Sequence, residues 1–591
     1  ASSIGEQPLK GIKNIYSMID MTLGELLTNL IFVKVDSLES IKVLTNWMWS
    51  INIETNDFLL TCAAIYLTDQ LKKLNIGIDG GKDSLFMNYK SEWETVMSPN
   101  TLVLKSIAPC KNINKKVSPF FKKPNSIIIY IDFNKHIRLG GSIFYKVNNK
   151  IGNYDEQPHF ENIGGFKYVW DTIQNLIDNN LILSGHDRSD GGLITTLIEM
   201  SISSHYGFEL TINKDKINPF NYFFNEELGL VLEVEKTNLS EVITQLNQLN
   251  QLNHINYTII GKTKLDRICT IIYNDKLILN EFCVNLWKEW EKTSYILEKE
   301  QCNIECAEEE YNELENRHNY NYTINENILE SLTEVFYHEP SIYSVGVVRT
   351  NGSNGEFEMA NILHESGFVV FDVTMTDIIN SGGDIIKQFH GLVFVGGFSY
   401  SDVLGSASGW ALSITSNKNV LNNFIDFYNN QTKFSMGICN GCQLLSKIGW
   451  IPNCKLIQNK SKRFESRYVS IKVEKSNNIF TKNMDNTIFG MWLAHGEGQF
   501  ILDDNSLLDC APLRYVDDDD TITEKYPYNP NGSKYGVAAL CSKNGNHIGI
   551  MPHPERSYKS WQMAHITENI NENYYTPWYM LFRNAFLFVS N

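Results

Sequence analysis

The sequence has 591 residues, of which 43% are hydrophobic and 20% are charged, and its formal net charge is −17. This length and composition predict a globular protein with about three to four domains. The acidity argues against a nucleic-acid partner, because binding to phosphates requires a basic face. The sequence contains no run of eighteen uncharged apolar residues, so it predicts no membrane span. Glu6 and Lys10 lie where a signal peptide would need apolar residues, so the start of the sequence does not read as a signal peptide.

The cysteines indicate the compartment. There are eleven of them, an odd number without the spacing of a disulfide framework, and this predicts reduced thiols and a cytoplasmic location. The sequence begins with Ala1 rather than Met, so we expect a processed chain or a piece of a longer one.

The first half of the chain divides into two predicted subdomains, residues 1–150 and 151–290. Apolar clusters alternate with turn signals in both, and the run SIIIYI at 126–131 is typical of a buried strand. Further strand candidates are LIL at 181–183 and LVLEV at 230–234. The pattern favours a mixture of strands and helices in each subdomain.

Residues 291–340 differ in composition from the segments on either side. Apolar residues become sparse, an acidic stretch follows Cys306, and Asn and Tyr dominate at 319–327. Such a composition buries little apolar surface, so we interpret this region as a linker or a low-complexity insertion.

Residues 341–591 predict a doubly wound α/β domain. The runs YSVGVV at 343–348 and GLVFV at 391–395 are typical of buried parallel strands, and helical patterns lie between them.

The segment FSMGICNGCQLLSK, at 434–447, predicts a nucleophilic cysteine. An apolar strand leads to Cys439, glycines flank it, and an amphipathic helix follows. This is the cysteine form of a nucleophile elbow, in which we expect the glycines to permit a sharp turn and the helix N-terminus to lower the thiol pKa. The alternative is a redox or zinc pair with Cys442, but no second cysteine pair with the spacing of a zinc site exists.

A base and an orienting acid are predicted near the C-terminus, in IGIMPHPER at 548–556. In an extended segment residues two apart face the same side, so Glu555 is placed to hold His553 in its working tautomer. An HPE tripeptide by itself is more often a surface turn. Its position after an apolar strand, downstream of the cysteine elbow, favours the catalytic interpretation.

Gly396 and Gly397 follow a third predicted strand, and backbone N–H groups in such a loop can stabilise an oxyanion. The cysteine elbow, the His-x-Glu pair and the glycine loop, in this order, resemble the class I glutamine amidotransferases. That family hydrolyses glutamine through a γ-glutamyl thioester and passes ammonia to a synthetase. The resemblance implies Cys439 as nucleophile, His553 as proton shuttle and Glu555 as orienting acid.

Further strings resemble the phosphoribosylformylglycinamidine synthase family over nearly the whole chain. They are GEQPLKG (5–11), GELLTN (24–29), NWMWS (46–50), GGKDSLFM (80–87), RLGGS (138–142), SGHDRSDGGL (184–193), GGFSYSDVLG (396–405), AHGEGQF (494–500), YPYNPNGS (526–533) and MPHPER (551–556). The large single-chain members have two AIR-synthetase-like modules before the amidotransferase. The resemblance implies that residues 1–290 are the second module, truncated at its start.

Two of these strings have features of a nucleotide–metal site. If 19–30 is a helix, Glu25 and Asn29 lie four residues apart on one face and present oxygen ligands suited to Mg²⁺. HDRSDGG, beginning at His186, precedes a helix, so Asp187 is a further candidate ligand and Ser189 and the glycines suit a phosphate. The alternatives are a solvated helix face and a helix capped by Asp190. The resemblance implies Glu25, Asn29 and Asp187 as magnesium ligands and Ser189 as a contact to ATP or to a structural ADP.

Two departures from the family pattern fall in the oxyanion loop. Ser401 stands where members usually have glycine, and 405–409 is a variant of a more glycine-rich run. We expect a further acidic ligand, a glycine-rich ATP loop and the partner module to lie before Ala1. Because such modules pair, we also expect an exposed apolar face and self-association in the chain alone.

The resemblance implies the glutamine- and ATP-dependent conversion of formylglycinamide ribonucleotide to its amidine, a step of purine biosynthesis. Two alternatives stay open. One is an amidotransferase that serves another ligase, such as those making GMP or CTP. The other is an incomplete fragment that hydrolyses glutamine, in which the first half is a nucleotide-binding scaffold.

Overall fold

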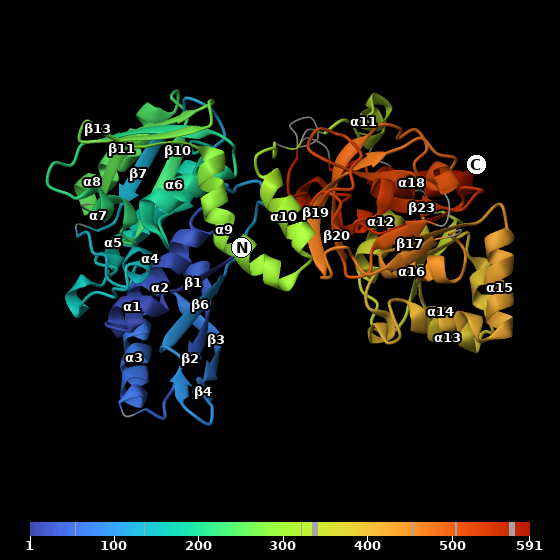
Figure 1. Cartoon of the computed structure of the whole chain (residues 1–591), viewed down its shortest axis with the longest axis horizontal. Helices are drawn as coiled ribbons and strands as arrows, with labels where there is room; N and C mark the ends of the chain where they lie inside the picture. The colour runs from blue at the N-terminus through green and yellow to red at the C-terminus, as the bar shows by residue number, and fades with distance from the viewer. Residues whose placement is uncertain are drawn as a thin grey trace. The chain divides into compact units, whose positions relative to one another are not determined.

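The structure is a computed structural model, and it describes residues 1–53, 55–134, 136–253, 255–318, 320, 322–333, 341–451, 454–502, 505–566 and 574–591. The chain forms two compact units, Ala1–Trp290 and Glu291–Asn591, which we call unit 1 and unit 2 (Figure 1). No helix among the described residues combines the length and the apolar character needed to cross a membrane.

Unit 1 begins with a four-stranded sheet and two long helices. Its elements are β1 (Ser2–Glu6), α1 (Pro8–Gly11), α2 (Ile15–Leu30), β2 (Lys42–Met48), α3 (Asn56–Leu74), β3 (Gly77–Ser84) and β6 (Thr101–Ile107). The strand order is β1-β6-β2-β3, with β2 antiparallel to β6 and parallel to β3. Asn14 caps α2 by accepting from the N–H groups of Tyr16 and Ser17. The helix predicted at 19–30 is thus confirmed and begins four residues earlier.

One face of this sheet packs on α2, and the other does not. A Cβ at Gly5 would lie 2.2 Å from the carbonyl oxygen of Thr22, so Gly5 faces α2 at close range. Because strand neighbours alternate, Ile4 points to the opposite face. Ile107 shares that face, since Ile4 pairs with Lys105 in the register. Ile4 and Ile107 are 55% and 47% exposed, so this face carries apolar side chains that no described element of unit 1 covers.

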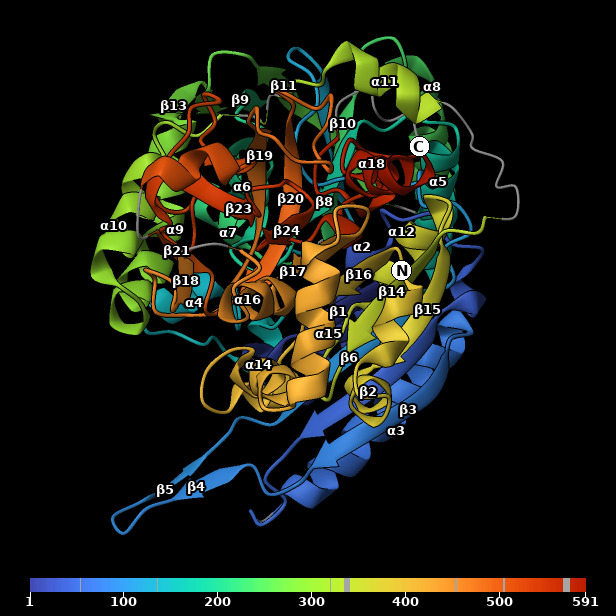
Figure 2. The same ribbon diagram turned by 90° about the vertical axis from the view of Figure 1, so that its right-hand side faces the viewer.

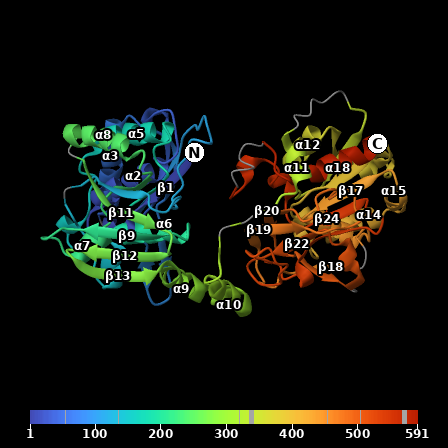
Figure 3. The same cartoon turned by 90° about the horizontal axis from the view of Figure 1, so that it is seen from above.

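A second, seven-stranded sheet completes unit 1. Its elements are β7 (Ile127–Asp132), α4 (Ile143–Val147), α5 (Ile163–Asp178), β8 (Ser184–Asp187), α6 (Gly192–Ile202), β9 (Gly207–Ile212), α7 (Pro219–Phe224), β10 (Gly229–Val234), α8 (Leu239–Asn253), β11 (Asn256–Lys264), β12 (Ile268–Tyr273) and β13 (Lys276–Phe282). The order is β13-β12-β9-β11-β7-β10-β8, and Figure 3 shows β13, β12, β9 and β11 in this sequence.

Both faces of the second sheet are buried at β7 and β10. Along β7, Ile129 and Ile131 pack in one core with residues of α5 and α8, while Ile128 and Tyr130 pack in another core with residues of α6. This alternation explains why 126–131 reads as a continuous apolar run. The strands predicted at 126–131 and 230–234 are confirmed as β7 and β10.

The strand predicted at 181–183 is wrong by three residues, because β8 is Ser184–Asp187. Its register is set by Glu233 of β10, a fully buried carboxylate. Glu233 accepts hydrogen bonds from the Ser184 hydroxyl (2.6 Å), the Ser126 hydroxyl (2.5 Å) and the N–H groups of Lys122 (2.8 Å) and Lys123 (3.0 Å). These polar contacts, rather than the apolar run before them, begin the strand.

A small hairpin extends from the first sheet. It consists of β4 (Asn88–Lys90) and β5 (Thr95–Met97), and Figure 2 shows it projecting from the rest of unit 1. Its large apolar side chains are exposed, Trp93 most of all at 90%.

The region 291–340, which we interpreted as a linker or insertion, holds much helix. α9 (Cys283–Gln301) runs into it, and α10 (Ile304–Glu313) and α11 (Glu326–Thr333) lie inside it; residues 319, 321 and 334–340 fall outside the described residues. α10 packs on the rest of unit 2 through acidic side chains. Glu309 pairs with Lys460 at 3.3 Å, Glu310 with Arg467 at 2.7 Å and Glu313 with Lys525 at 2.9 Å.

The N-terminus of α10 is held to unit 2 by its cap residue. The Asn303 amide donates to the carbonyl of Lys460 at 3.0 Å, and the Asn303 N–H donates to the carbonyl of Ser461 at 3.0 Å. We call these contacts the Asn303 clamp. They join α10 to the loop between two strands of unit 2.

Unit 2 is built on a nine-stranded sheet. Its elements are β14 (Ser344–Arg349), α12 (Glu356–Glu365), β15 (Val369–Thr374), α13 (Met375–Asn380), β16 (Gly391–Phe394), α14 (Ser408–Thr415), α15 (Lys418–Asn429), β17 (Phe434–Ile438), α16 (Asn440–Lys447), β18 (Cys454–Ile457), β19 (Glu465–Val473), β20 (Ile488–His495), β21 (Gln499–Leu502), β22 (Leu513–Val516), β23 (Val537–Cys541), β24 (His547–Ile550) and α18 (Tyr579–Ser590). The strands predicted at 343–348 and 391–395 are confirmed as β14 and β16.

The sheet order of unit 2 is β15-β14-β16-β17-β24-β23-β22-β19-β20, and the first five strands are parallel. Numbered along the chain, these five follow the order 2-1-3-4-5, which is a doubly wound arrangement. The order reverses between β14 and β16. Ligands of such sheets bind beyond the carboxyl ends of the strands near this point, which is where β16 meets the Gly396–Gly397 loop.

We expect Glu233→Ala to destabilise the second sheet of unit 1 by about 3 kcal/mol or more, because four donors, two of them the buried hydroxyls of Ser126 and Ser184, lose a charged acceptor. Hydrogen-exchange mass spectrometry of peptides from β7 and β10 measures the change. Glu235→Ala is the matched control, since Glu235 pairs with Lys123 near the surface and its loss should cost less than about 1 kcal/mol. Equal exchange rates in the two variants would contradict the role given to Glu233.

Candidate active site

Cys439 sits on a strained turn between β17 and α16. Its φ and ψ are 50° and −103°, a combination that a residue with a side chain adopts only when the surrounding structure imposes it. Two backbone hydrogen bonds do so: the Cys439 N–H donates to the carbonyl of Ile550 at 2.8 Å, and its own carbonyl accepts from the Gln443 N–H at 3.1 Å. The turn therefore presents the thiol beyond the carboxyl end of β17.

The flanking glycines have a different role from the expected one. Neither Gly437 nor Gly441 has a positive φ, so neither makes the turn. A Cβ at Gly441 would lie 2.1 Å from the carbonyl oxygen of Phe394, and one at Gly437 would lie 2.5 Å from that of Gly441. The glycines let α16 approach the sheet closely, and Cys439 itself takes the strained conformation.

The Cys439 side chain lies at a cavity of about 180 Å³, far above the roughly 10–15 Å³ that one water needs. The thiol donates to the carbonyl of Ala494 at 3.3 Å. The residues that line the cavity are Asn354, Gly397, Phe398, Asp402, Ser406, Cys439, Gln443, Phe464, Ala494, His495, Gly496, His553 and Arg556.

His553 and Glu555 reach this cavity because β24 lies parallel to β17. Ile438 pairs with Ile550, so the segments that follow the two strands emerge at the same edge. The Nδ1 atom of His553 is 2.6 Å from Oε1 of Glu555. A Cβ at Gly396 would lie 3.1 Å from Cε1 of His553 and 3.6 Å from Cβ of Cys439, which places imidazole and cysteine on the same side of that glycine.

The electrostatics of His553 suit a proton donor. Burial lowers its pKa, but the Glu555 carboxylate and then Cys439 raise it by more, to about 10. Both side chains are almost fully buried, and Nε2 of His553 has no hydrogen-bond partner within the described part of the chain. With Nδ1 directed at Glu555, Nε2 is the atom available to exchange a proton at the cavity.

Cys442 does not share the chemistry of Cys439. It is fully buried, and burial raises its pKa well above the ordinary value. The described residues contain no cluster of three or more His, Cys, Asp or Glu side chains placed to hold a metal ion. The redox or zinc interpretation of this cysteine pair therefore has no support from the geometry.

The Gly396–Gly397 loop offers a backbone donor to the cavity. Gly397 has a φ of 124° and bridges to Ser353. The two hydrogen bonds of this bridge come from the N–H groups of Phe398 and Asn354, so the Gly397 N–H takes no part in the bridge. Several non-glycine residues of the following loop are left-handed, among them Ser401 with a φ of 56°. Ser401, which stands where family members usually have glycine, thus has a left-handed conformation that glycine would adopt without strain.

In unit 1, hydrogen bonds link α2 to β8 and to the segment after it, where the predicted metal and nucleotide residues lie. Glu25 accepts from the Ser189 hydroxyl at 2.7 Å and from the Glu6 N–H at 2.7 Å. Burial raises the pKa of Glu25 to about 6, although these two hydrogen bonds lower it. Asp187 accepts from Thr28, one turn along α2 from Glu25, at 3.3 Å. Asn29 donates its amide N–H to the carbonyl of Ile4 at 3.1 Å, which leaves the oxygen ligand of its amide available.

Two carboxylates and one amide oxygen fit Mg²⁺, which takes one or two protein carboxylates and completes its shell with water and phosphate. The glycines after Ser189 only partly match the expected phosphate site. The Gly191 N–H donates to Glu226 at 2.9 Å, so this donor at the start of α6 is occupied. Asp190 makes no cap hydrogen bond to α6, and the alternative in which it simply caps the helix is wrong.

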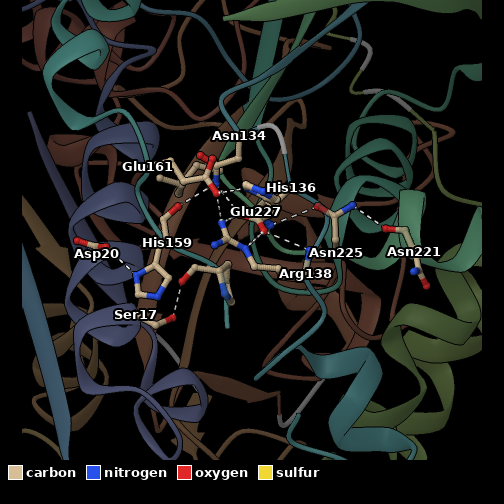
Figure 4. A network of polar contacts seen from close by, with 12 residues as sticks. Ser17, Asp20, Asn134, His136, Arg138, His159, Glu161, Asn221, Asn225 and Glu227 are labelled. Atoms are coloured by element: carbon tan, nitrogen blue, oxygen red, sulfur yellow. Dashed lines mark hydrogen bonds and ion pairs between the residues drawn. The ribbon is translucent and has the colours of Figure 1, made fainter. Parts of the chain in front are cut away.

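Unit 1 contains a partly buried ionic network whose residues have no role in the sequence-based predictions (Figure 4). Arg138 of the RLGGS string contacts Glu227 through Nε at 2.6 Å and Nη2 at 3.0 Å, and it pairs with Glu161 at 2.8 Å. Lys10 of the GEQPLKG string pairs with Glu226 at 2.8 Å, and both are buried. The charged residue inside each of these two recognised strings was the sequence signal that could have pointed to this network.

Three family models match the sequence of this chain. A CobB/CobQ-like glutamine amidotransferase domain matches residues 343–589, an FGAR-AT PurM_N-like domain matches 1–109, and the C-terminal domain of AIR synthase related protein matches 123–273. The fold class predicted from the sequence, an AIR-synthetase-like α/β and α+β part followed by a doubly wound amidotransferase, is confirmed.

Curated proteins match over 99% of this chain. Phosphoribosylformylglycinamidine synthase of Dictyostelium discoideum is 40% identical, with 46% of its length covered, and the human protein of that name is 33% identical, with 45% covered. Over almost its whole length the chain is thus similar to phosphoribosylformylglycinamidine synthases. A probable synthase of Arabidopsis thaliana, described as chloroplastic/mitochondrial, is 39% identical with 43% covered. The chain spans about half the length of the curated relatives it matches, and the family resemblance inferred from the motifs is confirmed.

We expect Glu555→Gln to reduce kcat for glutamine hydrolysis by about 10²- to 10⁴-fold, the usual range for a misoriented or mistuned general acid–base. The His553 imidazolium exists below its pKa, which Glu555 helps to hold at about 10. Without the Glu555 carboxylate the pKa of His553 falls, so the alkaline loss of activity should begin at a lower pH. A pH–rate profile measures both effects. Glu358→Gln, which removes a carboxylate 3.6 Å from Arg556, should leave the profile in place.

Proposed function

We propose that unit 2 hydrolyses glutamine at Cys439. The observation that carries this proposal is the arrangement of three side chains: a cysteine on a strained turn, an imidazole beside it, and a buried carboxylate 2.6 Å from the far imidazole nitrogen. A glutaminase requires a nucleophile, a proton shuttle and an orienting acid in this relation. The match of residues 343–589 to a glutamine amidotransferase model supports it.

Before the proposed attack, the proton of the Cys439 thiol passes to Nε2 of His553, which leaves a thiolate beside an imidazolium. In the first half of the reaction the thiolate attacks the side-chain amide carbon of glutamine. The carbonyl oxygen gains negative charge and accepts from the Gly397 N–H. His553 gives the proton on Nε2 to the amide nitrogen, the C–N bond breaks, and ammonia leaves. A γ-glutamyl thioester on Cys439 remains.

In the second half, His553 takes a proton from water through Nε2, and the water oxygen attacks the thioester carbon. The C–S bond breaks, which restores the Cys439 thiolate beside the His553 imidazolium, and the product leaves as glutamate after its new carboxyl group releases its proton to water. Glu555 keeps Nδ1–H directed at itself in both halves, so Nε2 always faces the reacting atoms.

We further propose that the whole synthase containing this chain converts formylglycinamide ribonucleotide, ATP and ammonia to the amidine. Its relatives bear that name. Glu25, Asn29 and Asp187 would hold Mg²⁺, and Ser189 would contact the nucleotide, either ATP that reacts or ADP that is structural. The ion, when bound, would neutralise charge on the phosphates. The relatives give no support to a ligase making GMP or CTP.

We also propose that unit 1 pairs with a second AIR-synthetase-like module. The sheet face that carries Ile4 and Ile107 exposes these apolar side chains beside Lys105, and no described element of unit 1 covers them. The relatives are about twice as long as this chain. The chain alone then corresponds to the fragment alternative, with glutaminase activity and a scaffold for nucleotide. All eleven cysteines are free thiols, which supports the proposed cytoplasmic location.

Cys439→Ala should reduce glutamine hydrolysis by the purified chain by more than about 10³-fold, because no other group can form the thioester. Coupled detection of released glutamate measures it. Cys442→Ala should retain activity within about threefold, since that side chain is buried behind the turn and does not line the cavity. A fully active Cys439→Ala protein would refute the assignment.

Glu25→Ala should weaken the binding of Mg²⁺–nucleotide to the chain by about tenfold or more, the effect of removing one charged ligand or its positioning hydrogen bonds. Titration calorimetry with ATP and Mg²⁺ measures the affinity. Asp69→Ala is the control, because Asp69 is an exposed carboxylate on α3 whose ion-pair partner is the exposed Lys72. Equal affinity in the two variants would remove Glu25 from the site.

A further inference from the structure

One wall of the glutamine cavity carries a second histidine that the proposed reaction does not use. His495 is the last residue of β20, lines the cavity with Cys439 and His553, and is 2% exposed. It follows Ala494, whose carbonyl accepts from the Cys439 thiol. His495 is therefore one residue from a direct contact to the nucleophile.

Neighbouring hydrogen bonds fix the tautomer of His495. The amide nitrogen of Asn459 donates to the carbonyls of Arg463 (3.0 Å) and His495 (2.8 Å), so its orientation is determined and Oδ1 is an acceptor. That oxygen accepts from the Gly498 N–H at 2.9 Å and lies 3.2 Å from Nδ1 of His495. Nδ1 must carry the hydrogen, and Nε2 is left as a lone-pair acceptor.

Nε2 of His495 is buried and has no hydrogen-bond partner among the described residues. It also stays unprotonated, because burial and the charge on His553 lower the pKa of His495 to about 3. A buried acceptor without a partner costs free energy that a bound ligand with a donor can recover. Among the residues that line the cavity, Gly397 thus offers a backbone N–H to an oxygen, and His495 offers a buried acceptor to an N–H.

We propose that Nε2 of His495 accepts a hydrogen bond from the side-chain N–H₂ group of bound glutamine and makes the site selective for the amide. This inference rests on the proposed glutaminase function of Cys439. The amide of glutamine satisfies both groups, since its oxygen faces Gly397 and its nitrogen faces His495. Glutamate lacks the N–H, and its carboxylate would face the His495 lone pair, so the product binds less well than the substrate.

The test compares an amide with an ester of the same length. Glutamate γ-methyl ester has a carbonyl for Gly397 and a leaving group for His553, but it has no N–H for His495. In His495→Leu we expect kcat/KM to fall about 10- to 100-fold for glutamine, which is the cost of an unpaired buried polar group, and less than about threefold for the ester. His495→Gln, whose side-chain oxygen can accept, should recover part of the loss with glutamine.

The matched control is His547→Gln. His547 is also a buried histidine, stacked on Tyr428, but it does not line the cavity, so any effect there should be equal for the two substrates. An equal loss of amide and ester hydrolysis in His495→Leu would show that His495 only supports the fold and would overturn the proposal. No change with either substrate would overturn it as well.

A measurement on the unaltered histidine covers the case in which His495→Leu does not fold. In Cys439→Ala protein labelled with ¹⁵N-histidine, the Nε2 resonance of His495, assigned by its loss in His495→Gln, should shift on addition of glutamine and not on addition of the ester. Equal shifts with both ligands would overturn the proposal. Failure of the glutaminase function is a separate result, seen when the wild-type chain hydrolyses neither substrate or when Cys439→Ala hydrolyses both.

Discussion

The parallel pairing of β17 with β24 is the constraint on which the candidate active site depends. Ile438 lies beside Ile550, and the carbonyl of Ile550 accepts the hydrogen bond that holds Cys439 in its strained turn. The same strand end that imposes the strain leads directly to His553. Nucleophile and base therefore share one support, and a shift of β24 would release the turn and withdraw the imidazole together.

Unit 1 combines two apolar cores with a set of buried carboxylates. Glu233 sets the start of β8, Glu226 neutralises Lys10 and accepts from the start of α6, and Glu227 holds Arg138. Each carboxylate is satisfied by several donors, which offsets the cost of removing it from water. Because these contacts join residues far apart in the sequence, they also fix which loops meet at Glu25 and Asp187.

Short-range patterns made the candidate triad predictable. Cys439 lies between a strand and a helix that the sequence shows directly, and His553 and Glu555 are two residues apart. The start of β8 could not be predicted, because it depends on Glu233, which is 49 residues from Ser184. The roles of Gly437 and Gly441 were misjudged because the sequence does not show which backbone atoms approach a glycine. His495 was inside a recognised string, but only the Asn459 amide, brought close by folding, reveals its free lone pair.

Because of the Asn303 clamp, the amidotransferase domain defined by contacts starts earlier in the chain than the domain defined by sequence similarity. The family model begins at residue 343, whereas the loop held by Asn303 contains Asn459, which orients His495. A protein excised at the homology boundary would keep every residue of the candidate triad and lose the brace behind one wall of its pocket. If this domain were joined to another synthetase, α10 would have to be included to keep that brace. The structural unit is therefore longer than the domain that sequence similarity defines.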